Sequence, residues 1–245
     1  MTDLVWLSED DPLPLPRFFH QDDLSLPSGL IALSNEMSPQ RLVEAYRLGI
    51  FPWYSESEPV MWWCTSPRMV LQVADFKVSR SLLKKIKQVL TDDSWEIRID
   101  SSFNQVIRSC AQVTRSYQGG GTWITDEIIE HYSTLNQWSI AHSVETWHNN
   151  RLIGGLYGIN LGKMMFGESM FTLEPDASKL ALAALCAWCA QVDISMIDCQ
   201  QETSHLASLG GAPISKTSFL DNLEQRVDLP SPQWAWNKTV LEHWL

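Results

Sequence analysis

The stretch from Leu152 to Gln200 most constrains what this chain can fold into. Two apolar runs, 152–159 and 164–171, flank a four-residue segment that contains Asn and Gly. Asn and Gly in so short a gap are typical of a β-hairpin. Residues 179–191 are rich in Ala and Leu and apolar almost all round, which predicts a buried helix. A short apolar run ending near Cys199 predicts a further strand, so the order is strand, strand, helix, strand. That order predicts a mixed sheet with a right-handed crossover.

Three polar residues interrupt this apolar block: Glu168, Asp198 and Gln200. Burying a bare carboxylate is costly, so each carboxylate needs a partner or lies in a cleft. Asp198 and Gln200 are two residues apart, which predicts side chains on the same face of a strand. Each carboxylate taken alone is equally well explained as a surface or strand-end residue. Three such groups in one block favour a functional site.

The composition excludes several classes of protein. The 245-residue chain has 18 Lys and Arg and a net charge of −11, which argues against broad, sequence-independent binding to DNA or other nucleic acid. It leaves room for a local basic patch. No apolar run is long enough to span a bilayer, and the N-terminus lacks the features of a secretory signal. Together with five cysteines, an odd number, this predicts a cytoplasmic protein with reduced thiols and no membrane partner.

Cys186 and Cys189 have the spacing of a redox or metal-binding pair. They lie well inside the predicted helix, whereas redox pairs sit at a helix N-terminus, and a metal site needs more ligands at short spacing. We interpret them as buried structural cysteines and expect no metal.

Helices are also predicted at 40–48, 79–90, 102–111, 126–137 and 216–227, and strands at 70–73, 95–99 and 141–148. The proline-rich residues 1–28 are predicted to be extended chain outside the core, with Phe18-Phe19 as an anchor. The aromatic residues between prolines over 51–63 suit either a packed cluster or a surface that stacks on bases, and we favour packing.

The helix over 79–90 carries four basic residues. They form either an ordinary solvated face or a patch that contacts phosphate groups: Arg80, Lys84, Lys85 and Lys87.

Ten short motifs, in this order, resemble leucyl/phenylalanyl-tRNA–protein transferases over about residues 28 to 220. They are Ala45–Trp53, Trp62-Trp63, Ser66–Arg68, Gly121–Thr125, Ala141–Glu145, Gly154–Gly158, Gly167–Phe171, Ala177–Lys179, Ile197–Gln200 and His205–Gly210. The resemblance implies an α+β fold: a small N-terminal domain, for which we take residues 1–69, and a C-terminal Gcn5-related acetyltransferase-like (GNAT) mixed-sheet domain over 70–245. It implies an enzyme without a cofactor that moves Leu or Phe from Leu-tRNA or Phe-tRNA to the N-terminal Arg or Lys of acceptor proteins, marking them for degradation.

The implied reaction is aminolysis of an activated ester, which needs a proton acceptor, hydrogen-bond donors and firm positioning. The family motifs fall on Asp198, Gln200 and Glu168 as catalytic residues. A Gln amide is a poor base, so we expect Asp198 and Gln200 to orient the reacting groups and supply electrostatic stabilisation. Glu168 would suit a cationic partner such as the acceptor amine.

The resemblance also implies binding surfaces for the donor. The candidates for the apolar pocket that holds the amino acid are Leu156, Met170, Phe171 and Leu185, the last replacing a Phe found in some relatives. Those for the terminal adenosine of tRNA are Tyr46, Trp53 and Trp123.

Two rival functions stay open from sequence. A coenzyme A-dependent GNAT acetyltransferase would need a Gly-rich phosphate-binding turn before the crossover helix, where this chain has Glu174 and Asp176. A non-catalytic tRNA-binding module would not need Glu168, Asp198 and Gln200 together.

Overall fold

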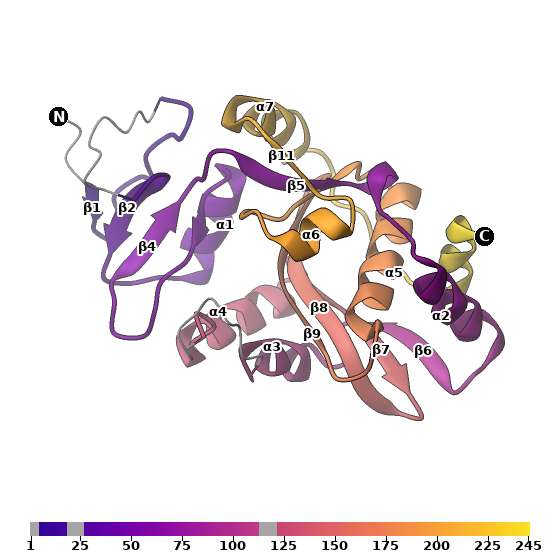
Figure 1. Ribbon diagram of the computed structural model, residues 1–245. Coiled ribbons are helices and arrows are strands. Elements are labelled where there is room, and N and C mark those ends of the chain that lie inside the picture. Colours follow the sequence, from indigo (N-terminus) through magenta and orange to yellow (C-terminus); the bar gives the residue numbers. More distant parts are fainter. Residues whose placement is uncertain (1–4, 19–26, 113–121) are drawn as a thin grey trace.

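The computed structural model describes residues 5–18, 27–112 and 122–245, and within them the chain forms two β-sheets. The smaller sheet lies at the N-terminal end, beside helix α1 (Pro39–Arg47) (Figure 1). Its strand order is β1 (Val5–Leu7), β2 (Leu30–Ser34), β4 (Val60–Trp63), β3 (Phe51–Pro52).

The larger sheet has seven strands and contains the predicted hairpin and crossover. Its order is β11 (Ala212–Ile214), β5 (Arg68–Gln72), β10 (Met196–Asp198), β9 (Met164–Thr172), β8 (Arg151–Leu161), β7 (Ala141–His148), β6 (Trp95–Ile99). β8 and β9 form the hairpin, and β10 pairs parallel to β9 after the chain has crossed over through α5 (Ala177–Gln191). The α+β class and the mixed sheet are thus confirmed.

Helices cover both faces of this sheet (Figure 1). One face, the α5 face, packs against α5 and α2 (Arg80–Thr91), and the 3-10 helix η2 (Lys238–Trp244) packs against these two helices. The opposite face, the α3–α4 face, packs against α3 (Phe103–Gln112) and α4 (Asp126–Gln137). Its apolar core is continuous with that of the small sheet and α1. The remaining short elements are η1 (Val73–Asp75), α6 (Ser204–Ser208) and α7 (Lys216–Arg226).

The composition of α5 explains its position. Nearly every residue from Ala177 to Cys189 is buried, because small Ala and Cys side chains alternate with Leu around the helix. The N-terminus of α5 also lies unusually close to the sheet. A Cβ atom added to Gly154 of β8 would lie 2.5 Å from the Cβ of Ala177, so only glycine allows this approach.

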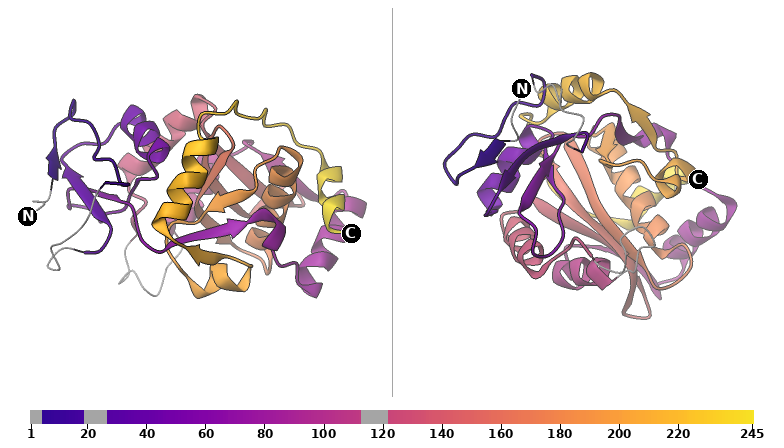
Figure 2. Two further views of the ribbon diagram at one scale, coloured as in Figure 1. Left: turned by 90° about the horizontal axis from the view of Figure 1, so that it is seen from above. Right: turned by 60° about the vertical axis from the view of Figure 1, so that its left-hand side comes forward.

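The C-terminal segment crosses the molecule and ties its parts together. After α7 it runs over the surface to η2 at the far end from the small sheet (Figure 2, left). The indole ring of Trp234 stacks at 4.0 Å on both His142 of β7 and Trp188 of α5. Its Nε1–H donates to Asn160 Oδ1 at 3.0 Å. Trp244 donates to the carbonyl of Ala183 at 3.0 Å. The tail is therefore part of the packed structure.

The predicted elements are confirmed to within a few residues, with exceptions in the N-terminal segment. Residues 5–7 form strand β1 parallel to β2, although residues 1–28 were expected to contribute no core element. Phe18 is 73% exposed, so the prediction of an anchor there is wrong, and Phe19 lies outside the described residues. The expected boundary between residues 69 and 70 falls inside β5, which begins at Arg68, and the division into domains stays a prediction.

Among the described helices, none has the length and apolar character needed to cross a bilayer. Cys186 and Cys189 are fully buried within α5, and burial raises the pKa of both thiols, as expected for structural cysteines. In the described ranges 5–18, 27–112 and 122–245, no cluster of His, Cys, Asp and Glu has the makeup of a metal site.

Candidate active site

Glu168 occupies an irregularity in the central hairpin. Tyr157 pairs with Ser169 and Gly158 pairs with Gly167, so Glu168 is an extra residue on β9 with no partner on β8. Such a β-bulge redirects the side chain that it carries. Gly158 permits the bulge, since a Cβ atom there would lie 2.2 Å from the carbonyl oxygen of Phe166. The bulge therefore gives the Glu168 side chain a direction that the regular alternation of side chains along the strand would not give it.

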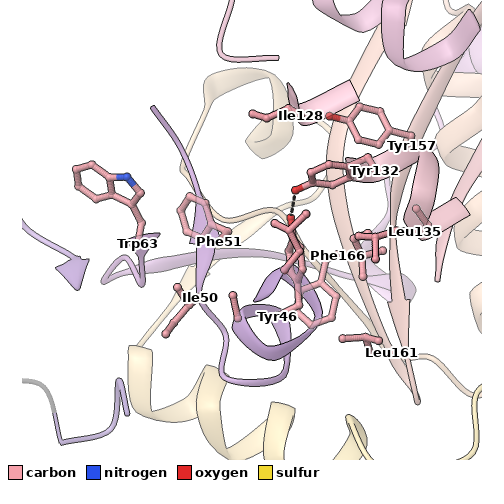
Figure 3. Packing of buried hydrophobic residues seen from close by; sticks show 14 of the residues in the cluster. Tyr46, Ile50, Phe51, Trp63, Ile128, Tyr132, Leu135, Tyr157, Leu161 and Phe166 are labelled. Carbon is pink, nitrogen blue, oxygen red and sulfur yellow. Dashed lines mark hydrogen bonds between the residues drawn. The ribbon is translucent and has the colours of Figure 1, made fainter. Parts of the chain in front are cut away.

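Three neutral hydrogen-bond donors surround the Glu168 carboxylate. Oε1 accepts from the Tyr46 hydroxyl at 2.7 Å and from the Gln200 amide at 3.1 Å, and Oε2 accepts from the Tyr132 hydroxyl at 3.3 Å. The two tyrosine hydroxyls also contact each other, from α1 and α4 (Figure 3). Burial raises the pKa of Glu168 to about 7, although the hydrogen bonds from the tyrosines lower it. Near neutral pH this carboxyl is therefore poised between its two protonation states.

Asp198 is held by a different kind of partner. Arg68 donates from Nε to Asp198 Oδ1 at 2.8 Å and from Nη2 to Oδ2 at 2.6 Å, and both side chains are 0% exposed. Burial opposes the charge on Arg68, but Asp198 outweighs it and raises the pKa of the guanidinium. The rings of Phe51 and Phe219 lie 4.8 and 4.4 Å from the guanidinium carbon. This closed ion pair leaves Asp198 no room to contact a substrate directly.

Gln200 links Asp198 to Glu168. Its backbone N–H donates to Asp198 Oδ1 at 3.0 Å, and its side-chain amide donates to Glu168. The expectation that Asp198 and Gln200 share one strand face does not hold, because β10 ends at Asp198 and Gln200 has a left-handed φ of 54°. The structure nevertheless brings Glu168, Asp198 and Gln200 together. With Arg68, Tyr46 and Tyr132 they form what we call the polar cluster.

Two members of the polar cluster were not singled out from sequence. Arg68 belongs to the Ser66-Pro-Arg68 motif, but its partner is 130 residues away, so spacing gives no sign of the pairing. Tyr132 lies on the buried side of α4 among Ile and Leu, where a hydroxyl does not stand out from the apolar pattern. A buried Tyr needs a hydrogen-bond partner, and that requirement is the only signal available in advance.

The expected pocket residues divide between the two faces of the large sheet. Leu156 of β8 and Met170 of β9 are paired and share the apolar cluster of the α5 face with Leu185. Phe171 belongs to the cluster of the opposite face. The structure therefore brings three of the four together. Met170 is partly exposed, whereas Leu156 and Leu185 are buried behind it.

The three aromatic residues expected at the adenosine have different surroundings. Tyr46 is fully buried in the polar cluster and packs on Phe166 with ring centroids 5.1 Å apart. Trp53 is partly exposed and meets Trp63 edge-on at 5.7 Å. Trp123 is partly exposed, and Gly121 in the same motif lies outside the described residues. Only the two tryptophans have ring surface open to a base. Most of the aromatic stretch over 51–63 is buried, as the packing interpretation expects.

Of the four basic residues of α2, three have exposed side chains and one has a partly buried side chain. Arg80, Lys84 and Lys87 are exposed and recur at the spacing of one helix face. Lys85 is partly buried with its Nζ 4.0 Å from the centre of the Trp95 ring. Beside the start of α2 lies a hollow of about 300 Å³ between α2, α5 and α6. Lys77, Lys179, Ser79 and Ser208 contribute polar groups to its lining.

Comparison with known proteins identifies the family. The family model described as "Leucyl/phenylalanyl-tRNA protein transferase" matches residues 70–224, and the model of that family's N-terminal domain matches residues 35–66. The chain belongs to the leucyl/phenylalanyl-tRNA protein transferase family. It is 51% identical to such a transferase from Paraburkholderia xenovorans over 96% of both chains. It is 49% identical to one from Ralstonia pickettii, over 98% of this chain and 97% of the relative.

One solved structure to which the chain is similar is much more distant than these relatives. A GCN5-related N-acetyltransferase-like protein from Streptococcus suis gives a TM-score of 0.31 at 16% identity, over 75% of this chain and 67% of that one. A match this low adds nothing to the description of the fold, which rests on the strand order and pairings given above.

Proposed function

We propose that this transferase moves Leu or Phe from the 3′ end of aminoacyl-tRNA to the α-amine of proteins with N-terminal Arg or Lys, forming a peptide bond. The observation that carries the proposal is Glu168, a carboxyl with a pKa of about 7 held by Tyr46, Tyr132 and Gln200. Attack on the ester requires a neutral amine, so a proton must leave the incoming ammonium. A carboxyl whose pKa lies near the working pH suits that transfer.

The electrostatics of the polar cluster give each residue a role in this proposal. Ionised Glu168 attracts the acceptor's ammonium and accepts its proton. In this proposal the Gln200 amide, which donates one N–H to Glu168, donates its other N–H to the oxyanion that forms as the amine attacks. Asp198 does not contact the substrate, because its carboxylate already accepts hydrogen bonds from Arg68 and from the Gln200 backbone N–H. Its role is to hold Gln200 in position. The tRNA ribose is the leaving group, and the proton that the amine loses is finally carried to it.

The donor would enter where β9 and β10 separate. Their pairing ends at Asp198 and Phe166, while β9 continues to Thr172. Met170, two residues beyond Glu168, is partly exposed on that continuation, with Leu156 and Leu185 behind it. Leu or Phe placed against Met170 would bring its ester close to Glu168 and Gln200. Trp53 and Trp123 offer stacking surface for the terminal adenosine.

The basic surface of α2 suits the phosphates of the tRNA. α6 begins four residues after Gln200, and its C-terminal end meets α2 at the hollow lined by Lys77 and Lys179. A tRNA strand leaving the polar cluster along α6 would therefore reach Lys84 and Lys87 on the exposed side of α2. In a chain of net charge −11, this local concentration of positive charge would attract phosphate.

A transfer assay tests the proposal. Purified protein is incubated with radiolabelled Leu-tRNA, Phe-tRNA or Met-tRNA and with acceptor proteins that differ only in a first residue of Arg, Lys or Met. We expect label to enter protein from Leu-tRNA and Phe-tRNA, and only with Arg- and Lys-terminated acceptors. Equal labelling of all acceptors would refute the acceptor class. Acetylation of the same acceptors from acetyl-coenzyme A, with no transfer from tRNA, would favour the acetyltransferase instead.

A further inference from the structure

Arg68 is the least explained charged residue of the polar cluster. It is 0% exposed at the start of β5, and its guanidinium lies between the rings of Phe51 of β3 and Phe219 of α7. Two of its nitrogens bind Asp198, while Nη1 has no hydrogen-bond partner within the described residues. A buried ion pair of this kind contributes little net stability compared with apolar residues of the same volume. Stability alone therefore does not account for Arg68.

The backbone of Gln200 is fixed on both sides of its Cα atom. On the amide side, its N–H donates to Asp198 Oδ1, the same oxygen that Arg68 Nε binds. On the carbonyl side, its oxygen accepts from the Met69 N–H at 3.2 Å and from the Thr65 hydroxyl at 3.1 Å. All of these contacts originate in residues 65–69 or pass through Asp198.

Fixing this backbone matters because Gln200 is in an unfavourable conformation. A left-handed φ is unfavourable for a non-glycine residue, so without these contacts the chain would relax toward an extended or right-handed conformation. Either change would move the side-chain amide, which donates to Glu168 Oε1 at 3.1 Å with the present backbone. The direction of the amide therefore depends on the anchoring of Asp198.

We propose that Arg68 is a positioning residue for aminoacyl transfer, which locks Asp198 and thereby holds the Gln200 amide against Glu168. Thr65 completes the lock from the carbonyl side of Gln200. Neither Arg68 nor Asp198 contacts substrate in this scheme. This inference rests on the proposed function, because its effect is read out in the transfer reaction.

The main test is Arg68→Lys. Lysine keeps the positive charge but cannot form two parallel hydrogen bonds with a carboxylate. We expect kcat for Leu transfer to fall by about tenfold to 100-fold, the range for a modest misplacement of a reacting group. KM for aminoacyl-tRNA and for the acceptor protein should stay within about twofold of wild type, because neither binding surface is touched.

Two controls separate positioning from simple loss of structure. Arg98→Lys breaks a bidentate pair of the same form, with Glu96 at 3.0 and 2.9 Å, on the distant edge strand β6, and should leave kcat unchanged. Ile86→Ala destabilises the fully buried core beneath α2 and should lower thermal stability without a matching loss of kcat per folded molecule.

A second variant keeps the inference testable if Arg68→Lys does not fold. Thr65 is only partly buried, so Thr65→Val should fold while losing the hydroxyl that binds the Gln200 carbonyl. We expect kcat to fall about threefold to tenfold, consistent with one weak hydrogen bond, and Thr65→Ser to restore it. In a preparation whose wild type transfers Leu, an unchanged kcat in Arg68→Lys overturns the positioning role alone, and where Arg68→Lys does not fold, an unchanged kcat in Thr65→Val does so. If the wild type itself transfers nothing, the proposed function is wrong.

Discussion

The two faces of the seven-stranded sheet bury different kinds of side chain. The α5 face is filled with Leu, Ala, Cys and Trp, and between Leu180 and Cys189 the helix buries nothing but apolar side chains and thiols. The α3–α4 face also buries aromatic residues, among them Tyr46 and Tyr132, whose hydroxyls contact each other (Figure 3). Both hydroxyls donate to the carboxyl of Glu168. The first face maximises the burial of apolar area, whereas the second accepts the desolvation cost of polar groups.

This difference indicates a division of labour. The α5 face supplies stability and the apolar residues behind Met170, while the α3–α4 face and helix α1 present the polar cluster. Buried polar groups that are not needed for stability are expected where they serve chemistry. If the division is real, substitutions in the apolar core beneath α5 should change stability, and substitutions in the polar cluster should change turnover.

The largest effect is expected from Glu168→Gln, which removes the ionisable group and keeps its shape. We expect kcat/KM for Leu transfer to fall about 100-fold or more, because Gln cannot accept the amine's proton or attract its charge. Thermal stability should not decrease, since a buried charge is lost. The matched control is Glu145→Gln, a carboxylate bound by Ser101, Ser102 and Ser143 and by the Trp147 indole. It should lose stability but keep its turnover. Equal turnover in Glu168→Gln and wild type would remove Glu168 from the mechanism.

Leu180→Ala tests the opposite face. Leu180 is 0% exposed in α5, and truncating such a residue costs about 2 to 5 kcal/mol of unfolding free energy, measured by denaturant titration. Turnover per folded molecule should stay within about threefold of wild type, since no member of the polar cluster is touched. A loss of turnover beyond the loss of folded protein would show that the two faces are coupled.

The pH dependence of transfer should report Glu168 directly. Burial raises its pKa to about 7, so the carboxylate form that the proposed mechanism requires is lost as the pH falls below about 7, and kcat/KM should fall with it. Stability should change in the opposite direction. The folded pKa lies above the unfolded value of 4.5, so the contribution of Glu168 to stability is fully present below pH 4.5 and is lost as the pH rises through 7.

Tyr46→Phe sharpens the pH experiment. The Tyr46 hydrogen bond lowers the pKa of Glu168, so its removal should move the acidic limb of the pH profile to higher pH. A profile that is the same in Tyr46→Phe and wild type would assign the titrating group elsewhere.

The smallest effects are expected on α2, outside both cores. Lys84→Glu and Lys87→Glu, made singly, should each raise KM for aminoacyl-tRNA severalfold and leave kcat unchanged. Each lost phosphate contact should reduce the slope of log affinity against log salt by about 0.7 to 0.9. Lys85 is less suitable because it also packs on Trp95. Lys238→Glu on η2 is the control, and an equal effect there would mean that only the overall charge matters.

The sequence predicted the parts of this structure that depend on local patterns. The hairpin, the apolar helix α5 and the capped helix α4 follow from turn residues, side-chain size and the Thr125 cap, all readable within a few positions. The arrangement of the polar cluster does not. Arg68 meets Asp198 only because β5 pairs with β10, and Tyr46 reaches Tyr132 only because α1 lies against α4. The resemblance of motifs pointed to Glu168, Asp198 and Gln200. It did not predict that Arg68 binds Asp198 or that the hydroxyls of Tyr46 and Tyr132 donate to Glu168.

The bulge at Glu168 has a consequence for how such a site can be gained or lost. Gly167 and Ser169 already face consecutive residues of β8, so a chain lacking Glu168 could keep every other pair of the hairpin in place. A single codon thus separates this hairpin from a regular one of the same topology. A deletion of Glu168 that folds with the hairpin intact but transfers nothing would show that the site is an insertion into the sheet, dispensable to the architecture that presents it.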